Sequence, residues 1–129
     1  MNDPEAYNEL AQVYLMVNEY DKAIFCLEEL LLHNQNDYKT LNKIGDIYCS
    51  KNNSADAKTA IKFYSRSILI NPTPRAFFGI QNCCSIIIKK EKKLDESNQK
   101  LMDISKKELT KFYENTNFKD FDVNKIFKV

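Results

Sequence analysis

Residues 7–34 read YNELAQVYLMVNEYDKAIFCLEELLLHN and contain two segments in which apolar residues recur at three- and four-residue steps. This is the period of one helix face, so the stretch predicts two amphipathic helices joined by a turn at residues 17–20. The apolar positions are Tyr7, Leu10, Ala11 and Tyr14 in the first helix and Ala23, Leu27 and Leu30 in the second. Because Ala11 and Ala23 are small, the two helix backbones can approach closely and form a hairpin.

The same hairpin pattern recurs along the chain. The first-helix positions return 34 residues later as Leu41, Ile44, Gly45 and Tyr48. The second-helix positions return 37 residues later as Ala60, Tyr64 and Ser67, because three additional residues fall in the turn at residues 52–56. A third copy begins at Arg75 with lower fidelity, and its matching first-helix positions are Phe77, Ile80 and Cys84. A repeat of this length predicts stacked hairpins, each of which buries its apolar face against a neighbour.

The order of residue types within each hairpin resembles the tetratricopeptide repeat. The first helix has bulky, leucine, small and aromatic positions, the second has small, large and small positions, and Asn71-Pro72 closes the unit. The resemblance covers roughly 90 residues. It implies an all-α fold, a tetratricopeptide-type α-solenoid of about three helical hairpins plus a C-terminal capping segment. We expect a repeat domain at residues 1–116, with repeats at about 4–37, 38–74 and 75–116. Residues 117–129 would form a tail that is a short helix or docks on a partner.

Proline and glycine help to place the helices. Pro4 favours a helix start and Pro72 stops a helix. Gly45 costs about 1 kcal/mol relative to alanine inside a helix, so its presence indicates close packing against the helix at residues 57–70. The predicted helices span residues 4–17, 20–33, 38–51, 57–70, 75–90 and 95–115. The apolar stripe of the last one is Leu101, Ile104, Leu109 and Phe112.

The composition argues against several classes of function. The 129 residues include 19 basic and 18 acidic side chains, and a net charge of +1 gives no overall field for nucleic acid or an anionic membrane. The basic run at residues 89–93 lacks interleaved aromatic residues, which favours a solvated helix end over a lipid or nucleic-acid contact. Two glycines leave no P-loop and no Rossmann fingerprint. Without a signal-peptide pattern or a run of roughly 18 apolar residues, we expect a cytosolic protein that does not span a membrane.

Residues that carry chemistry are few. No CxxC or Cys/His ligand spacing links the four cysteines, which are Cys26, Cys49, Cys83 and Cys84. We therefore expect free thiols that pack as small apolar residues in a reducing compartment. The single histidine, His33, is expected to interact with its own helix end and with Glu29 one turn upstream. No serine or cysteine has a plausible base, so we predict a protein that is not an enzyme and needs no metal or other cofactor.

Several short strings are more particular than the repeat requires, and they resemble subunit 2 of the endoplasmic reticulum membrane protein complex. They are YNELA at residues 7–11 with Tyr14, Tyr20 and Ala23, FCLEEL at residues 25–30 with Asn34, then Phe63-Tyr64, Ser67, Asn71-Pro72 and RAFFG at residues 75–79. Proteins of that family are longer, with further repeats upstream, so this chain resembles their C-terminal half. The match fades after Cys84.

This second resemblance implies a role and a place. It implies a scaffold that holds the cytosolic parts of other protein subunits in a complex that inserts transmembrane segments. The protein would then be cytoplasmic and peripheral on the cytosolic face of the endoplasmic reticulum membrane. Its partners would be protein subunits of that complex, or peptide segments from them, and not nucleic acid.

Stacked hairpins leave an inner curve lined by the first helix of each pair, and we expect a partner to bind there. The predicted partner-binding groove comprises Asn8, Gln12, Leu15, Met16, Lys39, Asn42, Asp46, Cys49, Phe78 and Ile86, and Ser50 and Asn82 share its face. Asn8, Gln12 and Asn42 would hydrogen-bond a peptide backbone. The buried anchors would be Leu15, Met16, Phe78 and Ile86. Alternatively, these are ordinary exposed residues, or the tail fills the groove.

Another interpretation is a co-chaperone-type adaptor that binds chaperone C-terminal peptides. Some tetratricopeptide domains hold such a carboxylate with lysine and asparagine. Here the first helix offers Asn8 and Gln12 without the lysine, and Asp46 would repel a carboxylate. Lys39, Asn42 and Lys43 could still contribute, although we favour the scaffold. Apolar residues around Leu15, Met16 and Leu31 also leave self-association of the chain open.

Overall fold

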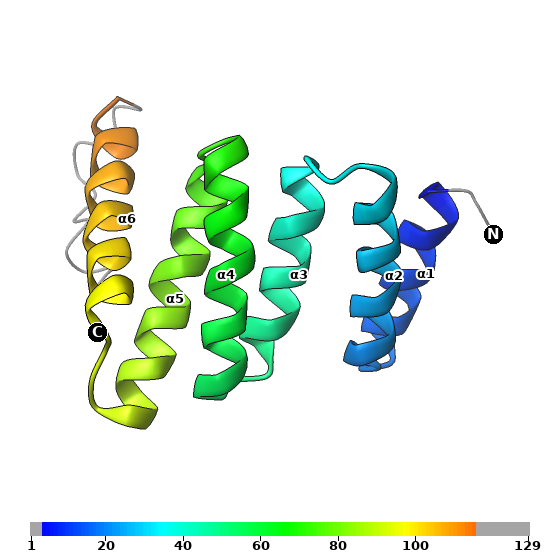
Figure 1. Cartoon of the computed structure of the whole chain (residues 1–129), viewed down its shortest axis with the longest axis horizontal. Coiled ribbons are helices and arrows are strands. Elements are labelled where there is room, and N and C mark those ends of the chain that lie inside the picture. The colour runs from blue at the N-terminus through cyan, green and yellow to red at the C-terminus, as the bar shows by residue number, and fades with distance from the viewer. Residues whose placement is uncertain (1–3, 116–129) are drawn as a thin grey trace.

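The computed structural model describes residues 4–115, which form six α-helices and no strand. The helices are α1 (Pro4–Met16), α2 (Tyr20–His33), α3 (Tyr38–Ser50), α4 (Ser54–Ile70), α5 (Pro74–Glu91) and α6 (Glu96–Asn115). They pair in order into three hairpins that stand side by side along the long axis, from α1 at one end to α6 at the other (Figure 1). The chain is an all-α, tetratricopeptide-type solenoid, as the repeat pattern predicted.

Local capping residues explain where the helices begin. The Asp37 side chain accepts a hydrogen bond from the Lys39 backbone amide at 3.1 Å, and the Asp95 side chain accepts one from Asn98 at 2.9 Å. Asn53 caps α4 by accepting from the Asp56 amide at 2.8 Å. That cap makes α4 begin at Ser54, three residues before the predicted start at residue 57. The other predicted boundaries agree with the structure to within one residue.

The buried side chains form two apolar clusters. One joins α1, α2 and α3 around Ala11, Ala23, Leu27, Leu41 and Ile44. The other joins α4, α5 and α6 around Ala60, Tyr64, Ile80, Ile87 and Leu109. Tyr48 is partly buried and packs against both clusters, which makes the core continuous from the first hairpin to the third. The small and large positions expected from the repeat therefore meet inside and between the hairpins.

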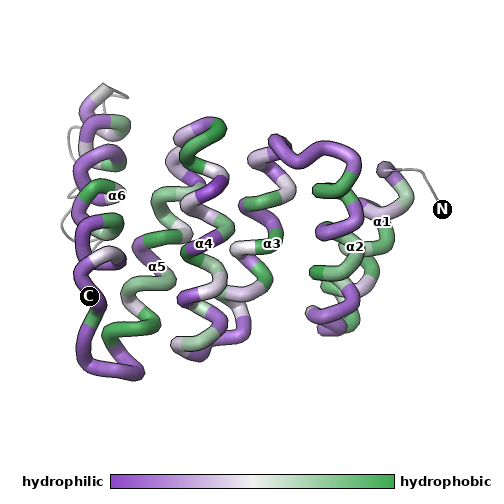
Figure 2. Tube along the Cα trace, in the orientation of Figure 1, coloured by the Kyte–Doolittle hydropathy of each residue, from purple (hydrophilic) through white to green (hydrophobic). Residues whose placement is uncertain are grey.

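The buried face of α6 differs from the predicted stripe. Leu101 and Met102 pack against the second cluster, and Ser105 and Leu109 are fully buried. Ile104 and Phe112, which the stripe placed inside, are exposed. Helix α6 carries alternating hydrophilic and hydrophobic turns (Figure 2). The apolar residues of α6 thus fit the helical period on more than one face, and packing against α5 buries the face that contains Ser105.

Two smaller expectations are also corrected. Within residues 4–115, His33 and Glu29 do not form an ion pair. Instead the centroid of the His33 ring lies 6.4 Å from that of the Tyr7 ring. Leu31, expected on an exposed first-repeat surface, is buried because it packs in the first apolar cluster. All four cysteines are free and buried, as expected. The predicted tail at residues 117–129 lies outside the described residues.

Candidate functional site

Tyr64 reaches from α4 between α3 and α5, and two glycines make this possible. A Cβ atom on Gly45 of α3 would lie 2.9 Å from the Tyr64 ring, and one on Gly79 of α5 would lie 2.3 Å from its Cζ atom. Both distances are shorter than carbon atoms tolerate, so neither position accepts a larger residue without movement of the ring. The close packing predicted for Gly45 is confirmed. The matching role of Gly79 could not be recognised from the repeat pattern alone.

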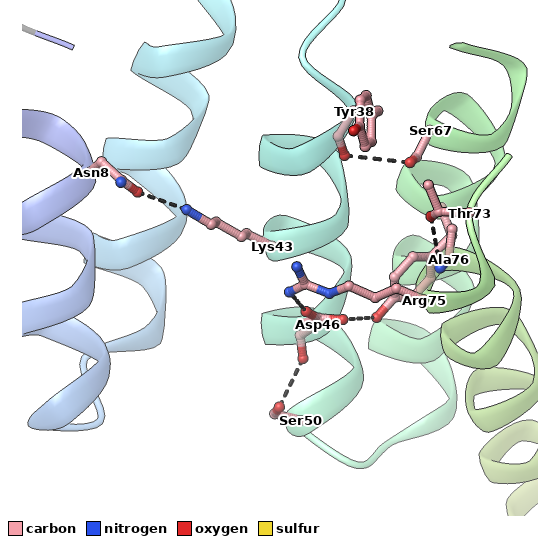
Figure 3. A network of polar contacts seen from close by, with 10 residues as sticks. Asn8, Tyr38, Lys43, Asp46, Ser50, Ser67, Thr73, Arg75 and Ala76 are labelled. Atoms are coloured by element: carbon pink, nitrogen blue, oxygen red, sulfur yellow. Dashed lines mark hydrogen bonds and ion pairs between the residues drawn. The ribbon is translucent and has the colours of Figure 1, made fainter. Parts of the chain in front are cut away.

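The Tyr64 hydroxyl donates a hydrogen bond to Asp46 on α3. Arg75, in the first turn of α5, donates to the other carboxylate oxygen of Asp46 and forms an ion pair with it (Figure 3). Burial, with the hydrogen bond to Asp46 as a second cause, raises the pKa of Tyr64 above its usual value, so the phenol stays protonated and remains a donor. Three helices therefore converge on one carboxylate, whose two oxygens are both engaged.

An open pocket of about 380 Å³ lies between α3 and α5 at this point. We call it the α3/α5 pocket; it is lined by Asp46, Cys49, Ser50, Tyr64, Arg75, Phe78, Gly79 and Asn82. Its volume falls within the range of pockets that hold small molecules or side chains of a partner. The pocket combines a charge-paired centre with an aromatic wall at Phe78. Such a lining can accept polar backbone groups and one apolar side chain.

The predicted groove residues are only partly brought together. Asp46, Cys49 and Phe78 line the α3/α5 pocket, with Ser50 and Asn82 from the same predicted face. The remaining exposed members are Gln12, Met16 and Lys39, whereas Leu15 and Ile86 are partly buried against the apolar clusters. Asn8 accepts a hydrogen bond of 3.0 Å from Lys43 and so links α1 to α3 (Figure 3).

Asn42 requires a correction. Its side chain was expected to meet a peptide backbone, but it is only 2% exposed and points into the packed interior. Its Oδ1 atom has no hydrogen-bond partner among the described residues. A buried amide in this position cannot reach a partner on the surface, because its neighbours on α3 and the adjacent helices cover it.

Three lining residues were missed by the prediction from sequence, namely Gly79, Arg75 and Tyr64. Arg75 was noticed only as the start of a helix and as part of a family string, and Tyr64 only as a large residue on a buried face. The signal that could have found Arg75 is its position immediately after Pro74, which places it in the exposed first turn of α5. No sequence signal pairs it with Asp46, 29 residues away.

The apolar surface at the free side of the first hairpin differs from the predicted one. A pocket of about 400 Å³ is lined there by Tyr7, Leu10, Tyr14, Asp21, Lys22, Phe25 and Cys26. Leu10 is exposed, whereas the equivalent Ile44 and Ile80 are fully buried because a preceding hairpin covers them. The self-association considered above would therefore involve Leu10 and Phe25 rather than Leu31.

The thiol in the α3/α5 pocket is chemically distinct from the other three. A hydrogen bond from Cys83 lowers the pKa of Cys49, and the same contact raises the pKa of Cys83. Burial raises the pKa of Cys84 to about 12 and also raises that of Cys26. Because the thiolate is the nucleophile, we expect Cys49 to react with iodoacetamide at least about tenfold faster than Cys83 or Cys84. Mass spectrometry of the folded chain during labelling would measure this.

Cys49→Ser serves as the control for that experiment, since it should abolish the earliest adduct and leave those of Cys26 and Cys84, whose pKa values do not depend on Cys49, unchanged. Labelling of Cys83 or Cys84 before Cys49 would contradict the described arrangement of the pocket.

Two further features of residues 4–115 bear on other classes of function. No cluster of three or more His, Cys, Asp or Glu side chains there is arranged to hold a metal ion. None of the helices in that range combines the length and apolar composition needed to cross a membrane.

Comparisons with known proteins agree with this architecture. Residues 4–37 match the tetratricopeptide repeat family. The chain is 31% identical over 124 residues to TPR repeat protein oca3 of Schizosaccharomyces pombe, covering 94% of this chain and 39% of that protein. It is 32% identical over 81 residues to ER membrane protein complex subunit 2-B of Xenopus laevis, covering 62% of this chain and 27% of that protein.

A shorter match involves the peroxisomal targeting signal 1 receptor of Dictyostelium discoideum, 36% identical over 55 residues and 9% of that protein. The chain thus spans less than two fifths of the length of these relatives. The repeat match and the similarity to a complex subunit point to a protein-interaction scaffold and away from an enzyme.

Proposed function

We propose that this tetratricopeptide-repeat chain is a non-catalytic scaffold of the kind found in subunit 2 of the endoplasmic reticulum membrane protein complex. In this proposal it holds cytosolic segments of other subunits while peripheral on the cytosolic face of that membrane, and so contributes to membrane protein insertion. The similarity over 81 residues to subunits of that complex supports the proposal. The repeat fold supports it as well, because stacked hairpins present extended surfaces for protein partners.

The observation that carries the proposal is the α3/α5 pocket. Its charged groups are already satisfied, because Asp46 is engaged by both Arg75 and Tyr64. The pocket therefore offers no free cation for a carboxylate, and a neutral peptide segment fits it better. The Ser50 hydroxyl donates to the Asp46 backbone carbonyl at 2.8 Å, and the Asn82 amide nitrogen donates to Cys49 Sγ at 3.4 Å. The side-chain oxygens of Ser50 and Asn82 can therefore accept hydrogen bonds from a peptide backbone, while Phe78 contacts an apolar side chain.

The same geometry disfavours the co-chaperone alternative. Lys43 is engaged with Asn8, and Asn42 is buried, so two of the three residues that could have formed a carboxylate clamp are committed elsewhere. Lys39 remains exposed at the start of α3. The similarity to a targeting-signal receptor, which covers only a short stretch of that protein, is compatible with peptide recognition by this chain.

The test is affinity purification of the intact tagged protein from its own cells, followed by identification of bound proteins. Subunits of a membrane-embedded endoplasmic reticulum complex should co-purify with the wild type. Asn82→Arg fills the α3/α5 pocket from an exposed position and should remove most of this recovery. Gln99→Arg makes the same charge change at an exposed position of α6 outside the pocket, and it should leave recovery unchanged.

Recovery of chaperones alone, without any membrane protein, would contradict the scaffold assignment. A second experiment measures direct binding of a synthetic peptide ending in EEVD to the chain. Tight binding of that peptide, weakened by Lys39→Ala and strengthened by Asp46→Asn, would support the adaptor instead.

A further inference from the structure

A second groove lies between α4 and α6 and shares no residue with the α3/α5 pocket. Both helices pack against α5 more than against each other, which leaves a hollow of about 490 Å³ between them. We call it the α4/α6 groove. Its floor is formed by Ile61, Leu101 and Ile104, and Lys62, Arg66 and Lys100 also line it.

The floor is apolar and incompletely covered. Ile61 is buried and continuous with the second apolar cluster, and Leu101 packs partly against that cluster. Ile104 on α6 is 52% exposed, so this part of the floor is open to solvent. When a further apolar group covers the exposed isoleucine and the hollow beside it, water is displaced from both apolar surfaces, and this burial is favourable in free energy. The recessed position of Ile61 suits a protruding side chain better than a flat bilayer surface.

The charges around this floor are of one sign. Lys62, Arg66 and Lys100 contribute three cations, and no carboxylate is among the lining residues. Lys100 forms an ion pair of 3.4 Å with Glu96, but both side chains are largely exposed, so the pair is weak and readily exchanged. Within residues 4–115, Lys62 and Arg66 are in none of the ion pairs, and the Arg66 guanidinium lies 5.8 Å from the Phe63 ring centroid.

This local excess of positive charge stands out because the chain as a whole carries a net charge of only +1. From it we infer that the α4/α6 groove binds an acidic amphipathic peptide segment of a partner protein. Apolar side chains of the segment lie on Leu101 and Ile104, and its carboxylates meet Lys62, Arg66 and Lys100. The inference goes beyond the proposed function, since it concerns a different surface and does not depend on what occupies the α3/α5 pocket.

The test is fluorescence anisotropy with the full chain and a labelled designed peptide. The probe is a helix of about 18 residues with leucine at positions i, i+3, i+4 and i+7 and mainly glutamate elsewhere. A second probe replaces every glutamate with lysine. We expect the acidic probe to bind, the basic probe not to bind, and the affinity of the acidic probe to fall as salt is raised.

Three variants locate the binding. The double variant Lys62→Glu/Arg66→Glu should weaken binding of the acidic probe about tenfold or more, because it reverses two of the three cations. Ile104→Asp should weaken it similarly by adding a charge to the apolar floor. The double variant Lys106→Glu/Lys107→Glu makes the same total charge change at exposed positions of α6 outside the groove, and it should bind nearly as the wild type does.

All substituted side chains are exposed, so folding should be retained, and circular dichroism would verify it. Equal binding of the acidic and basic probes would overturn the inference, as would equal weakening by the two double variants. Failure of the full chain to bind the acidic probe would also overturn it, including the case in which residues 116–129 occupy the groove.

Discussion

Replacing Tyr64 with alanine is expected to lower the free energy of unfolding by about 3–5 kcal/mol, the cost typical of truncating a large buried aromatic residue. Tyr64 is 1% exposed and contacts α3 and α5 at Gly45 and Gly79, so no neighbouring side chain can refill the space. Total stabilities of about 5–15 kcal/mol make this a large fraction of the whole. Urea denaturation followed by circular dichroism would measure the loss.

Tyr64→Phe separates packing from hydrogen bonding, because it keeps the ring and removes only the donor to Asp46. Its cost should be smaller, about 1.5–3 kcal/mol at most, the range for hydrogen bonds to charged groups. Both variants should also loosen the α3/α5 pocket, since Asp46 then depends on Arg75 alone for its position. A Tyr64→Ala variant as stable as the wild type would show that the ring is not buried between the two glycines.

Gly79→Ala is expected to destabilise the chain by about 1–3 kcal/mol, as overpacking of a core does. The new methyl would lie 2.3 Å from the Tyr64 ring, and the ring is held by α3 on its other side. This cost outweighs the gain of about 1 kcal/mol that alanine brings to a helix interior. Gly45→Ala is the matched comparison and should cost less, because its contact would be 2.9 Å.

The combination of the two changes provides the decisive measurement. In the Tyr64→Ala background the obstacle is gone, so Gly79→Ala should become neutral or stabilising by up to about 1 kcal/mol. The sign of the effect would thus reverse between the two backgrounds, which a double-mutant cycle detects directly. If Gly79→Ala destabilised the chain equally in both backgrounds, the new methyl group would clash with a group other than Tyr64.

The candidate site depends on the same packing. Tyr64 fills the space between α3 and α5 and at the same time orients Asp46 at the surface. A substitution that moves the ring therefore alters the shape and the hydrogen bonding of the α3/α5 pocket together. For this reason the binding test relies on Asn82, which lies at the exposed rim, rather than on residues that stabilise the fold.

Local features of the sequence were sufficient to predict the helices and the class of the fold. The spacing of Ala11, Ala23 and Leu27 reports which faces are buried, because helix geometry places residues three and four apart on one side. On α6 the helical period predicted that Ile104 is buried. In the structure α6 packs against α5 through the face that contains Ser105, so Ser105 is buried and Ile104 is exposed. Counting positions along the repeat likewise placed Asn42 in the exposed groove, although its neighbours in space bury it.

What the sequence by itself determined is the repeat: three helical hairpins, small residues where helices touch, and a chain without an obvious catalytic inventory. These follow from contacts between residues close in the chain and from one period that recurs. Only the tertiary structure decided that Asp46 is engaged by Tyr64, 18 residues away, and by Arg75, 29 residues away. It also decided that α4 and α6 leave a positively charged groove open. Such pairings depend on the rotation and separation of packed helices, which no spacing within a single helix specifies.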